Sequence, residues 1–484
     1  MILKNPQQTW NLQNTYSELP KKFHVKQVPA ITKNPKLFYF NKKLAKQLSL
    51  DFLNDDILSI EKYLSGNIIP NGSVPIAQAY AGHQFGQFTM LGDGRAILLG
   101  EQINSNGKKF DIQLKGSGQT PYSRRGDGKA TLSSMLREYI MSESMYHLGI
   151  PTTRSLAIIK TEDNIHRETN NEGGILTRIA SSHIRVGTFE YARHFCTMED
   201  FQIFIDYVIN RHYPSITNTS NPYLDLLKTV MHKQIELIVD WMRIGFIHGV
   251  MNTDNMSISG ETIDYGPCAF INKYDPTTVF SSIDRHGRYA FGNQPKIAYW
   301  NLTIFAGTLL PFISKNKNSA IQLAEEVLND FPLEYSNKWH EMMQNKLGIT
   351  NPIKEDKALI ENLMQLMNKH KADYTNTFLG LTLNKSSNDV MFNSNEFNNW
   401  KEQWKHRLTN KEHSLKIMKM NNPTIIPRNH LVESALKNAI EGNKDELDAL
   451  LRLTSNPYDY GSKQDYFQSI PEGFDESYKT FCGT

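Results

Sequence analysis

Residues 245–266 read Gly-Phe-Ile-His-Gly-Val-Met-Asn-Thr-Asp-Asn-Met-Ser-Ile-Ser-Gly-Glu-Thr-Ile-Asp-Tyr-Gly. This pattern predicts a strand at residues 256–258, a turn at 259–261 and a return strand that ends at Asp264. A hairpin of that length brings its ends together, so Asn255 and Asp264 would face one point. An amide oxygen and a carboxylate suit Mg²⁺, which shares its ligand shell with substrate phosphates. The stretch therefore predicts a site for a metal-bound nucleotide.

The same stretch has the layout of a protein-kinase catalytic loop followed by a metal-binding Asp-Phe-Gly. His248-Gly249 stands in place of His-Arg, and residues 264–266 stand at the metal position. Such a loop carries its catalytic Asp five residues before the metal-binding Asn, and here that residue is Val250. Valine can neither accept a proton nor orient a hydroxyl, and the nearest carboxylate is Asp254. The loop predicts nucleotide binding but argues against ordinary phosphoryl transfer.

Composition excludes several classes of protein. The chain has 484 residues, of which 39% are apolar, a formal net charge of +3 and three cysteines. It is therefore a folded chain, without a basic run for nucleic acid or membranes and without a disulfide framework. No signal or transit pattern begins it, and no segment reaches the roughly 18 apolar residues of a membrane span. We expect a cytoplasmic protein without nucleic-acid or membrane partners; a monomer is favoured, although the sequence does not fix the oligomeric state.

A glycine-dense segment at residues 81–94 precedes a predicted strand at 96–101. Glycines at such spacing let backbone N–H groups approach an anion. A second strand, residues 110–115, ends at Lys115, and a Gly- and Arg-rich loop leads to a predicted helix that begins near residue 132 and contains Glu138. A strand Lys followed by a mid-helix Glu is the kinase arrangement, in which the carboxylate holds the Lys over the nucleotide phosphates.

The order of predicted elements defines the architecture. Strands at residues 155–159 and 174–179 complete a β-rich region, and amphipathic helices at 201–212 and 223–244 follow it. Beyond residue 300 most segments have helical periodicity, at 318–328, 338–346, 357–370, 397–407 and 431–441. We predict an α+β, protein-kinase-like fold with two lobes: an N-terminal extension (1–75), a β-rich nucleotide-binding lobe (76–195), a helical catalytic lobe (196–300) and a helical C-terminal region with a redox-candidate tail (301–484).

Five blocks together resemble the selenoprotein O family, kinase-fold proteins that transfer AMP to protein hydroxyls. They are Leu-Gly-Asp-Gly-Arg (91–95), Gln-Leu-Lys-Gly-Ser-Gly (113–118), Arg-Arg-Gly-Asp-Gly (124–128), Thr-Arg-Ile-Ala-Ser-Ser-His-Ile-Arg (177–185) and His-Gly-Val-Met-Asn-Thr-Asp-Asn (248–255). The match is close over residues 78–300 and loose beyond. In that family the missing catalytic Asp is the rule, and ATP sits inverted relative to a kinase.

The resemblance implies a role for each matching residue. Lys115 would contact the phosphates and pair with Glu138, Asn255 and Asp264 would hold Mg²⁺ or Mn²⁺, and Asp254 would accept the proton of a Ser, Thr or Tyr hydroxyl on a protein, including the enzyme itself. The residues implied to bind ATP are Gly92, Gly94, Arg95, Lys115, Asp127, Gly128, Arg178, Arg185 and Asp264.

Alternatives remain open. Asp254 could instead orient the neighbouring metal ligand Asn255. A kinase-type phosphotransferase is disfavoured by Val250, and a catalytically silent nucleotide-binding pseudokinase is disfavoured because it would not need Lys115, Glu138, Asn255 and Asp264 together. Transfer of AMP from ATP to proteins is the function that the residues and the resemblance favour.

Two cysteines form a candidate redox pair. Cys268 follows the stretch at residues 245–266 that is predicted to hold the metal, here called the metal loop. Cys482 lies in a C-terminal tail long enough to reach it. The family commonly ends in Cys or selenocysteine followed by two serines, whereas this chain ends Cys482-Gly483-Thr484. A disulfide between them would be transient in a reducing compartment and would couple activity to redox state. The alternative is that Cys268 is an ordinary buried thiol and Cys482 is inert.

Overall fold

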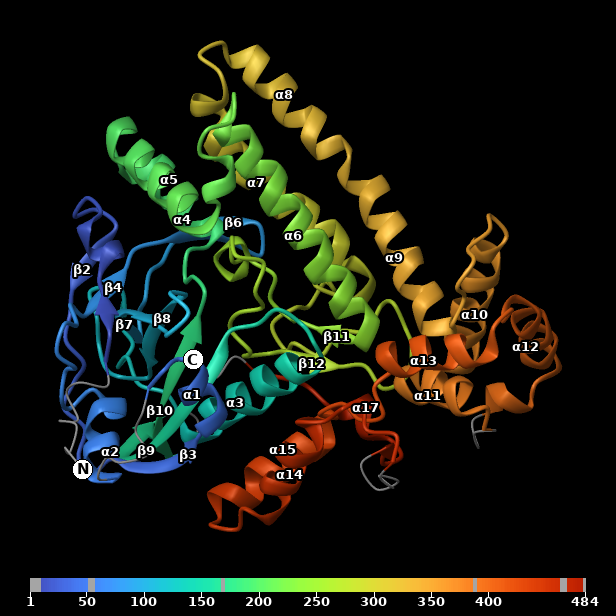
Figure 1. The fold of residues 1–484 in the computed structure, drawn as a ribbon. Helices are drawn as coiled ribbons and strands as arrows, with labels where there is room; N and C mark the ends of the chain where they lie inside the picture. The colour runs from blue at the N-terminus through green and yellow to red at the C-terminus, as the bar shows by residue number, and fades with distance from the viewer. Residues whose placement is uncertain (1–9, 51–56, 167–169, 386–389, 462–467, 482–484) are drawn as a thin grey trace.

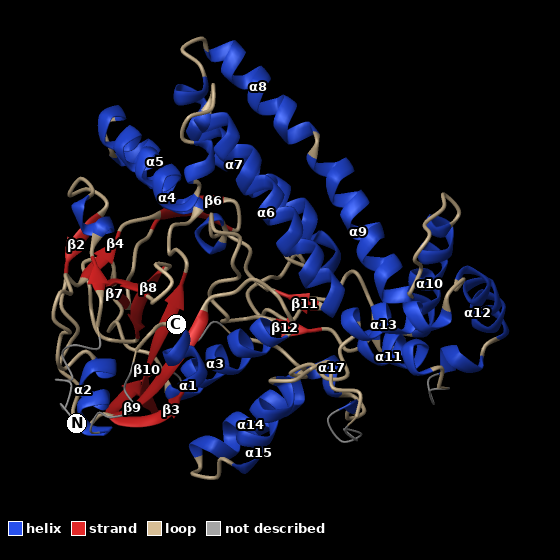
Figure 2. Ribbon diagram, in the orientation of Figure 1, coloured by secondary structure: helices blue, strands red, loops and turns tan. Residues whose placement is uncertain are grey.

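A computed structural model of the chain describes residues 10–50, 57–166, 170–385, 390–461 and 468–481. Strands gather in the N-terminal part of the molecule, and helices make up nearly all of the C-terminal half (Figures 1 and 2). The predicted succession of a β-rich part and a helical part is confirmed. No helix among the described ranges combines the length and apolarity needed to cross a bilayer.

One antiparallel sheet organises the N-terminal part, in the order β2-β4-β7-β8-β10-β9-β3, with β1 paired to β7. The predicted strands at residues 96–101, 110–115, 155–159 and 174–179 lie within four of these. The bounds are β1 (Leu12–Gln13), β2 (His24–Lys26), β3 (Lys36–Phe40), β4 (Ile76–Gln78), β7 (Ala96–Ile103), β8 (Lys109–Lys115), β9 (Arg154–His166) and β10 (Asn170–Ala180). Residues 1–75, expected as an extension ahead of the nucleotide-binding lobe, supply both edge strands of its sheet.

The alternation of side chains along the strands divides the core into two layers. On one face Leu98, Ile158 and Leu176 pack with α3 (Leu132–His147) in the main core. On the other face their neighbours Leu99, Ile159 and Ile175 pack with α1 (Lys42–Gln47) and α2 (Ile57–Ser65). Helix α3 begins where the Thr131 side chain accepts a hydrogen bond from Ser134 N. Packing in the main core holds α3 against the sheet, and Glu138 lies in its second turn.

The helical part is built around α6, which packs between α7 and α9 and leads into residues 245–266 (Figure 1). Helices α14 and α15 return to pack on α3. The bounds are α4 (Val186–Phe195), α5 (Met198–His212), α6 (Pro222–Ile244), α7 (Gln294–Ile313), α8 (Lys317–Asn329), α9 (Phe331–Leu347), α10 (Asp356–His370), α11 (Tyr374–Leu383), α12 (Asn395–Arg407), α13 (Lys411–Asn421), α14 (Asn429–Ile440), α15 (Asp445–Thr454) and α17 (Phe474–Ser477).

The hairpin predicted at residues 256–263 was wrong. After α6 the chain forms β11 (Phe246–Ile247) and a single 3₁₀ turn, η4 (Thr253–Asn255), and β12 (Ala269–Phe270) returns to pair with β11. Between them the backbone pairs with neighbouring segments: Val186 N donates to Met256 O at 2.9 Å, and Thr153 N donates to Thr262 O at 3.0 Å. A strand of three residues gains few bonds from a hairpin partner, so pairing with the packed segments around it satisfies the same groups.

Candidate functional site

A cavity of about 1120 Å³ lies between the sheet, α3, the loop at residues 250–267 and the C-terminal tail. It brings together every residue expected to bind the nucleotide or the metal or to take the proton, although these residues come from distant parts of the chain. They are Gly92, Gly94, Arg95, Lys115, Asp127, Gly128, Glu138, Arg178, Arg185, Asp254, Asn255 and Asp264.

The charges at the centre of the cavity are arranged around Asp264. Lys115 Nζ lies 2.6 Å from Glu138 Oε2 and 2.7 Å from Asp264 Oδ1. Arg178 Nη1 lies 2.7 Å from the same Oδ1, and Arg185 Nη2 lies 3.6 Å from Oδ2. Burial opposes ionisation of Asp264, but these three cations outweigh it and hold its pKa well below the usual range. Asp264 is therefore a carboxylate, and the cations beside it are placed to meet phosphate oxygens.

Replacing Lys115 with Met is expected to lower the rate of nucleotide transfer on the order of 10²-fold, because a charged donor aimed at the phosphates is lost. Methionine keeps the length of the side chain in this buried position. The measurement is kcat/KM for ATP in purified protein. As a control, Lys371→Met removes a lysine whose ion pair with Asp275 is at the surface. A loss of only a few-fold in Lys115→Met would place this lysine outside the chemistry.

The glycine-rich wall of the cavity is fixed by packing as well as by backbone conformation. Gly92 has φ 135°, and a Cβ at this position would lie 2.4 Å from the Tyr122 ring. Only glycine fits there. The Gly- and Arg-rich loop at residues 116–129 is ordered partly by Asp127, whose Oδ1 accepts a hydrogen bond from Lys129 N at 2.9 Å. Tyr122 of this loop packs on Gly92, so the two glycine-containing loops form the wall together.

The catalytic loop presents Asp254 and Asn255 from η4. The Asn255 side chain donates through Nδ2 to Val250 O at 2.9 Å. Asp254 is buried, and its Oδ1 has no hydrogen-bond partner among the described residues. Burial raises the pKa of Asp254 to about 7, although the Arg185 guanidinium acts in the opposite direction. Gly82 packs directly on this carboxylate, because a Cβ there would lie 2.5 Å from Asp254 Oδ1.

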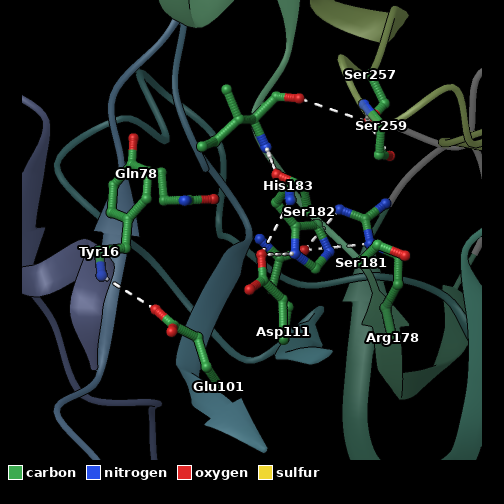
Figure 3. Close-up of polar contacts among 12 residues, drawn as sticks. Tyr16, Gln78, Glu101, Asp111, Arg178, Ser181, Ser182, His183, Ser257 and Ser259 are labelled. Carbon is green, nitrogen blue, oxygen red and sulfur yellow. Dashed lines mark hydrogen bonds and ion pairs between the residues drawn. The ribbon is translucent and has the colours of Figure 1, made fainter. Parts of the chain in front are cut away.

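A second polar network joins β8 to the segment that follows β10, and Figure 3 shows Asp111 beside His183 in this network. The Asp111 carboxylate accepts hydrogen bonds from His183 N at 2.9 Å and from Arg211 Nη2 at 2.5 Å. Burial raises the pKa of Asp111, but Arg211 and His183 outweigh it and hold the pKa below its usual range. On the same strand, Gln113 Oε1 accepts from Arg178 Nη2 at 2.6 Å. Two residues of β8 therefore fix the segment that carries Arg178 and leads to Arg185.

The C-terminal tail closes one side of the cavity through Arg137, the residue before Glu138. Arg137 Nη2 donates to Cys268 O at 2.7 Å and to Tyr478 Oη at 3.2 Å. Its Nη1 lies 2.7 Å from Glu433 on α14. One side chain of α3 thus joins the metal loop, α14 and the tail.

The candidate redox pair is only partly described. Cys268 is fully buried, and burial raises the pKa of its thiol to about 12. Cys482 lies outside the described residues. The tail nevertheless passes beside the metal loop, because Thr480 Oγ1 donates to Pro267 O at 2.8 Å.

Several residues of the site escaped the sequence analysis. Tyr122 and Arg137 have no local pattern that separates them from ordinary loop and helix residues, and the role of Gln113 was not predicted. Their roles depend on contacts with segments far along the chain. A signal was available for Gln113 alone, since it precedes Lys115 by two and so faces the same side of the strand.

Comparison with known proteins identifies the family of the chain. A family model described as protein adenylyltransferase SelO matches residues 6–455. A protein nucleotidyltransferase YdiU from Brevibacillus brevis is 53% identical over 480 residues, which is 98% of each chain. Proteins of the same name from Clostridium beijerinckii and Clostridium perfringens are 54% and 53% identical, each over 482 residues and 98% of both chains. The chain belongs to the SelO family of protein adenylyltransferases.

Proposed function

We propose that this chain transfers AMP from ATP to Ser, Thr or Tyr hydroxyls of proteins, with Asp254 as the general base. The observation that carries the proposal is the combination of a complete phosphate-binding set with Val250 at the position of a kinase base. Lys115, Glu138 and Asp264 are in contact, whereas the only carboxylate of the catalytic loop in the cavity is Asp254. Its side chain lines the cavity, and its buried Oδ1 has no hydrogen-bond partner among the described residues, so the carboxylate is not committed to another group through that oxygen.

The two lobes are proposed to be arranged as in a protein kinase. The strand lysine is Lys115 on β8, its glutamate partner is Glu138 on α3, and the metal ligands come from the loop that follows α6. The resemblance implies that ATP binds in the inverted orientation. The α-phosphate then faces the acceptor, and Arg178, Arg185, Asp127 and Gly128 bind the far end of the triphosphate.

Asn255 and Asp264 fit a hard divalent cation, Mg²⁺ or Mn²⁺. The hydrogen bond from Asn255 Nδ2 to Val250 O leaves the amide Oδ1 for a cation. Asp264 Oδ2 lies 3.6 Å from Arg185 Nη2, which is beyond hydrogen-bond distance, so this oxygen too would be left for a cation. The described residues contain no cluster of three or more His, Cys, Asp or Glu able to hold a metal, so phosphate and water oxygens would complete the ligand shell. The cation would neutralise charge on the phosphates during transfer.

In the reaction, the acceptor oxygen forms a bond to the α-phosphorus as the bond to the bridging oxygen of the leaving pyrophosphate breaks. Asp254 takes the proton of the hydroxyl. Lys115, Arg178 and Arg185 stabilise the charge that develops on the phosphate oxygens. The products are an AMP ester of the protein and pyrophosphate.

Incubation with ATP labelled at either the α- or the γ-phosphate tests the proposal. We expect the α-label to become bound to protein, including the enzyme itself, and the γ-label to leave as pyrophosphate. The readout is protein-bound label after denaturation, with Asp264→Ala as the background. Bound γ-label without α-label would identify a phosphotransferase, and neither label would identify a silent nucleotide-binding protein.

The proposal extends to regulation by Cys268 and Cys482. With oxidised glutathione, the two thiols would lose two protons and two electrons and form a disulfide that fixes the tail beside the metal loop. Because Cys268 is fully buried, the loop must open first. We expect a linked Cys268–Cys482 peptide in non-reducing peptide mapping, a transfer rate that changes with dithiothreitol, and no such change in Cys482→Ser. Cys196→Ser is the matched control, and absence of the linked peptide contradicts the switch.

A further inference from the structure

A small hairpin lies beside η4, and Gln84 and Phe85 at its turn line the cavity. It consists of β5 (Ala81–Gln84) and β6 (Gln87–Met90), and across the described ranges these two strands pair only with each other. Its backbone is bonded to the catalytic loop: His83 N donates to Thr253 Oγ1 at 2.7 Å, and Phe85 N donates to Asn252 Oδ1 at 3.1 Å. The hairpin is therefore fixed relative to Asp254, which lies between Thr253 and Asn255.

The two strands of the hairpin differ in their surroundings. β5 packs against α4 and η4. β6 is largely exposed, and its outer edge offers unpaired backbone N–H and C=O groups in this part of the structure. An exposed strand edge can accept a further strand through main-chain hydrogen bonds.

The surface beside β6 is apolar although it faces solvent. Met90 is 49% exposed, Phe88 37% and Phe195, on α4, 40%. The rings of Phe88 and Phe195 stack with centroids 6.4 Å apart, and Met198 at the start of α5 is also exposed. We call Phe88, Met90 and Phe195 the rim cluster. The rim cluster does not line the cavity itself, but Phe85 at the turn and Leu91, next to Met90, do. Large exposed apolar side chains grouped beside a cavity are typical of a surface that a partner covers.

We propose that the segment of the acceptor protein that carries the hydroxyl binds in extended form along β6 and places an apolar side chain on the rim cluster. The inference rests on the proposed function, since it assumes that the hydroxyl reaches Asp254. Gln84 and Phe85 line the same cavity as Asp254. A segment that enters the cavity therefore passes over the hairpin, and this continuity favours the acceptor over a second copy of the chain.

The proposed geometry has a consequence for sequence preference. An extended chain advances about 3.3 Å per residue, and successive side chains point to opposite faces. A hydroxyl held at Asp254 thus fixes which neighbouring residue of the acceptor meets the rim cluster. We expect a preference for an apolar residue at one fixed spacing from the modified residue.

The test uses a positional-scanning library of peptides, each with one Ser, Thr or Tyr, and ATP labelled at the α-phosphate. Wild-type protein is expected to favour an apolar residue at one position. Met90→Glu should lower kcat/KM for the favoured peptides by about tenfold and favour a basic residue at that position. Met90→Lys should favour an acidic residue there. Met420→Glu, at an exposed position on α13, is the matched control.

In both Met90 variants, the KM for ATP and the rate at which AMP is released from ATP without an acceptor should be unchanged. An identical preference in wild type, Met90→Glu and Met90→Lys overturns the docking site, as does labelling of proteins without any labelling of peptides, because an extended-segment site accepts an unfolded peptide. Absence of α-label on every protein and peptide would instead overturn the proposed function itself.

Discussion

Asp264→Ala is expected to lower the rate of AMP transfer by about 10³-fold or more, because a metal held at the phosphates would lower the activation barrier by several kcal/mol. The structure adds a second reason. The Asp264 carboxylate is the shared anionic partner of Lys115, Arg178 and Arg185, so its removal leaves neighbouring buried cations that repel one another. The measurement is transfer of α-label by purified protein with ATP and Mg²⁺.

Two control variants separate chemistry from folding. Asp264→Asn keeps the shape of the side chain and tolerates the φ of 64° at this position. It should retain the fold better than Ala, because its amide oxygen can still accept hydrogen bonds from Lys115 and Arg178, yet remain nearly inactive because it lacks the negative charge. Asp275→Asn removes a carboxylate from an ion pair near the surface and should change neither property. Near-full activity in well-folded Asp264→Ala would show that this carboxylate does not hold a metal.

Asp254→Asn is expected to lower kcat by about 10²- to 10⁴-fold, the usual contribution of a general base. Asparagine has the same shape but cannot take the proton. Binding of ATP with Mg²⁺, measured by calorimetry, should be nearly unchanged, because Asp254 is not among the phosphate-binding groups. If Asp254 instead orients Asn255, metal and nucleotide affinity would fall together with the rate.

Gly82→Ala offers a matched variant that retains the carboxylate. Its new Cβ would lie 2.5 Å from Asp254 Oδ1 and would displace it. We therefore expect kcat to fall in Gly82→Ala without loss of ATP binding. A normal rate in this variant would contradict a role for Asp254 that depends on position.

The contact between Lys115 and Glu138 was predictable because each residue sits in an element with a clear period. Alternation along β8 and helical spacing along α3 place both side chains between the sheet and the helix, and the structure has them 2.6 Å apart. The conformation of residues 256–263 was not predictable in this way. The backbone groups of this segment find partners at Val186 and Thr153 instead of in a hairpin, and short-range patterns carry no information on such distant neighbours.

The same limit explains what was missed at the edges of the site. The first strands of the chain contain no motif, yet β3 pairs with β9 and β1 pairs with β7. Arg137 looks like any charged residue of an amphipathic helix, but it contacts Glu433 and Tyr478 from the far end of the chain. The residues proposed to bind the nucleotide were selected by their chemistry and line one cavity, whereas the residues that support them depend on the tertiary fold.

The sheet order has a consequence for synthesis of the protein on the ribosome. Because β3 pairs with β9 and β8 pairs with β10, the sheet cannot close until residues near 180 have emerged. Until then the backbone groups along the edges of the earlier strands stay unpaired, and strand pairings this distant in sequence form slowly. Thr480 of the tail donates to Pro267 O beside the metal loop, and Glu433 and Tyr478 bond to Arg137, so these contacts form only when the C-terminal region has been made. A nascent chain therefore carries most residues of the candidate site well before it can hold them in place.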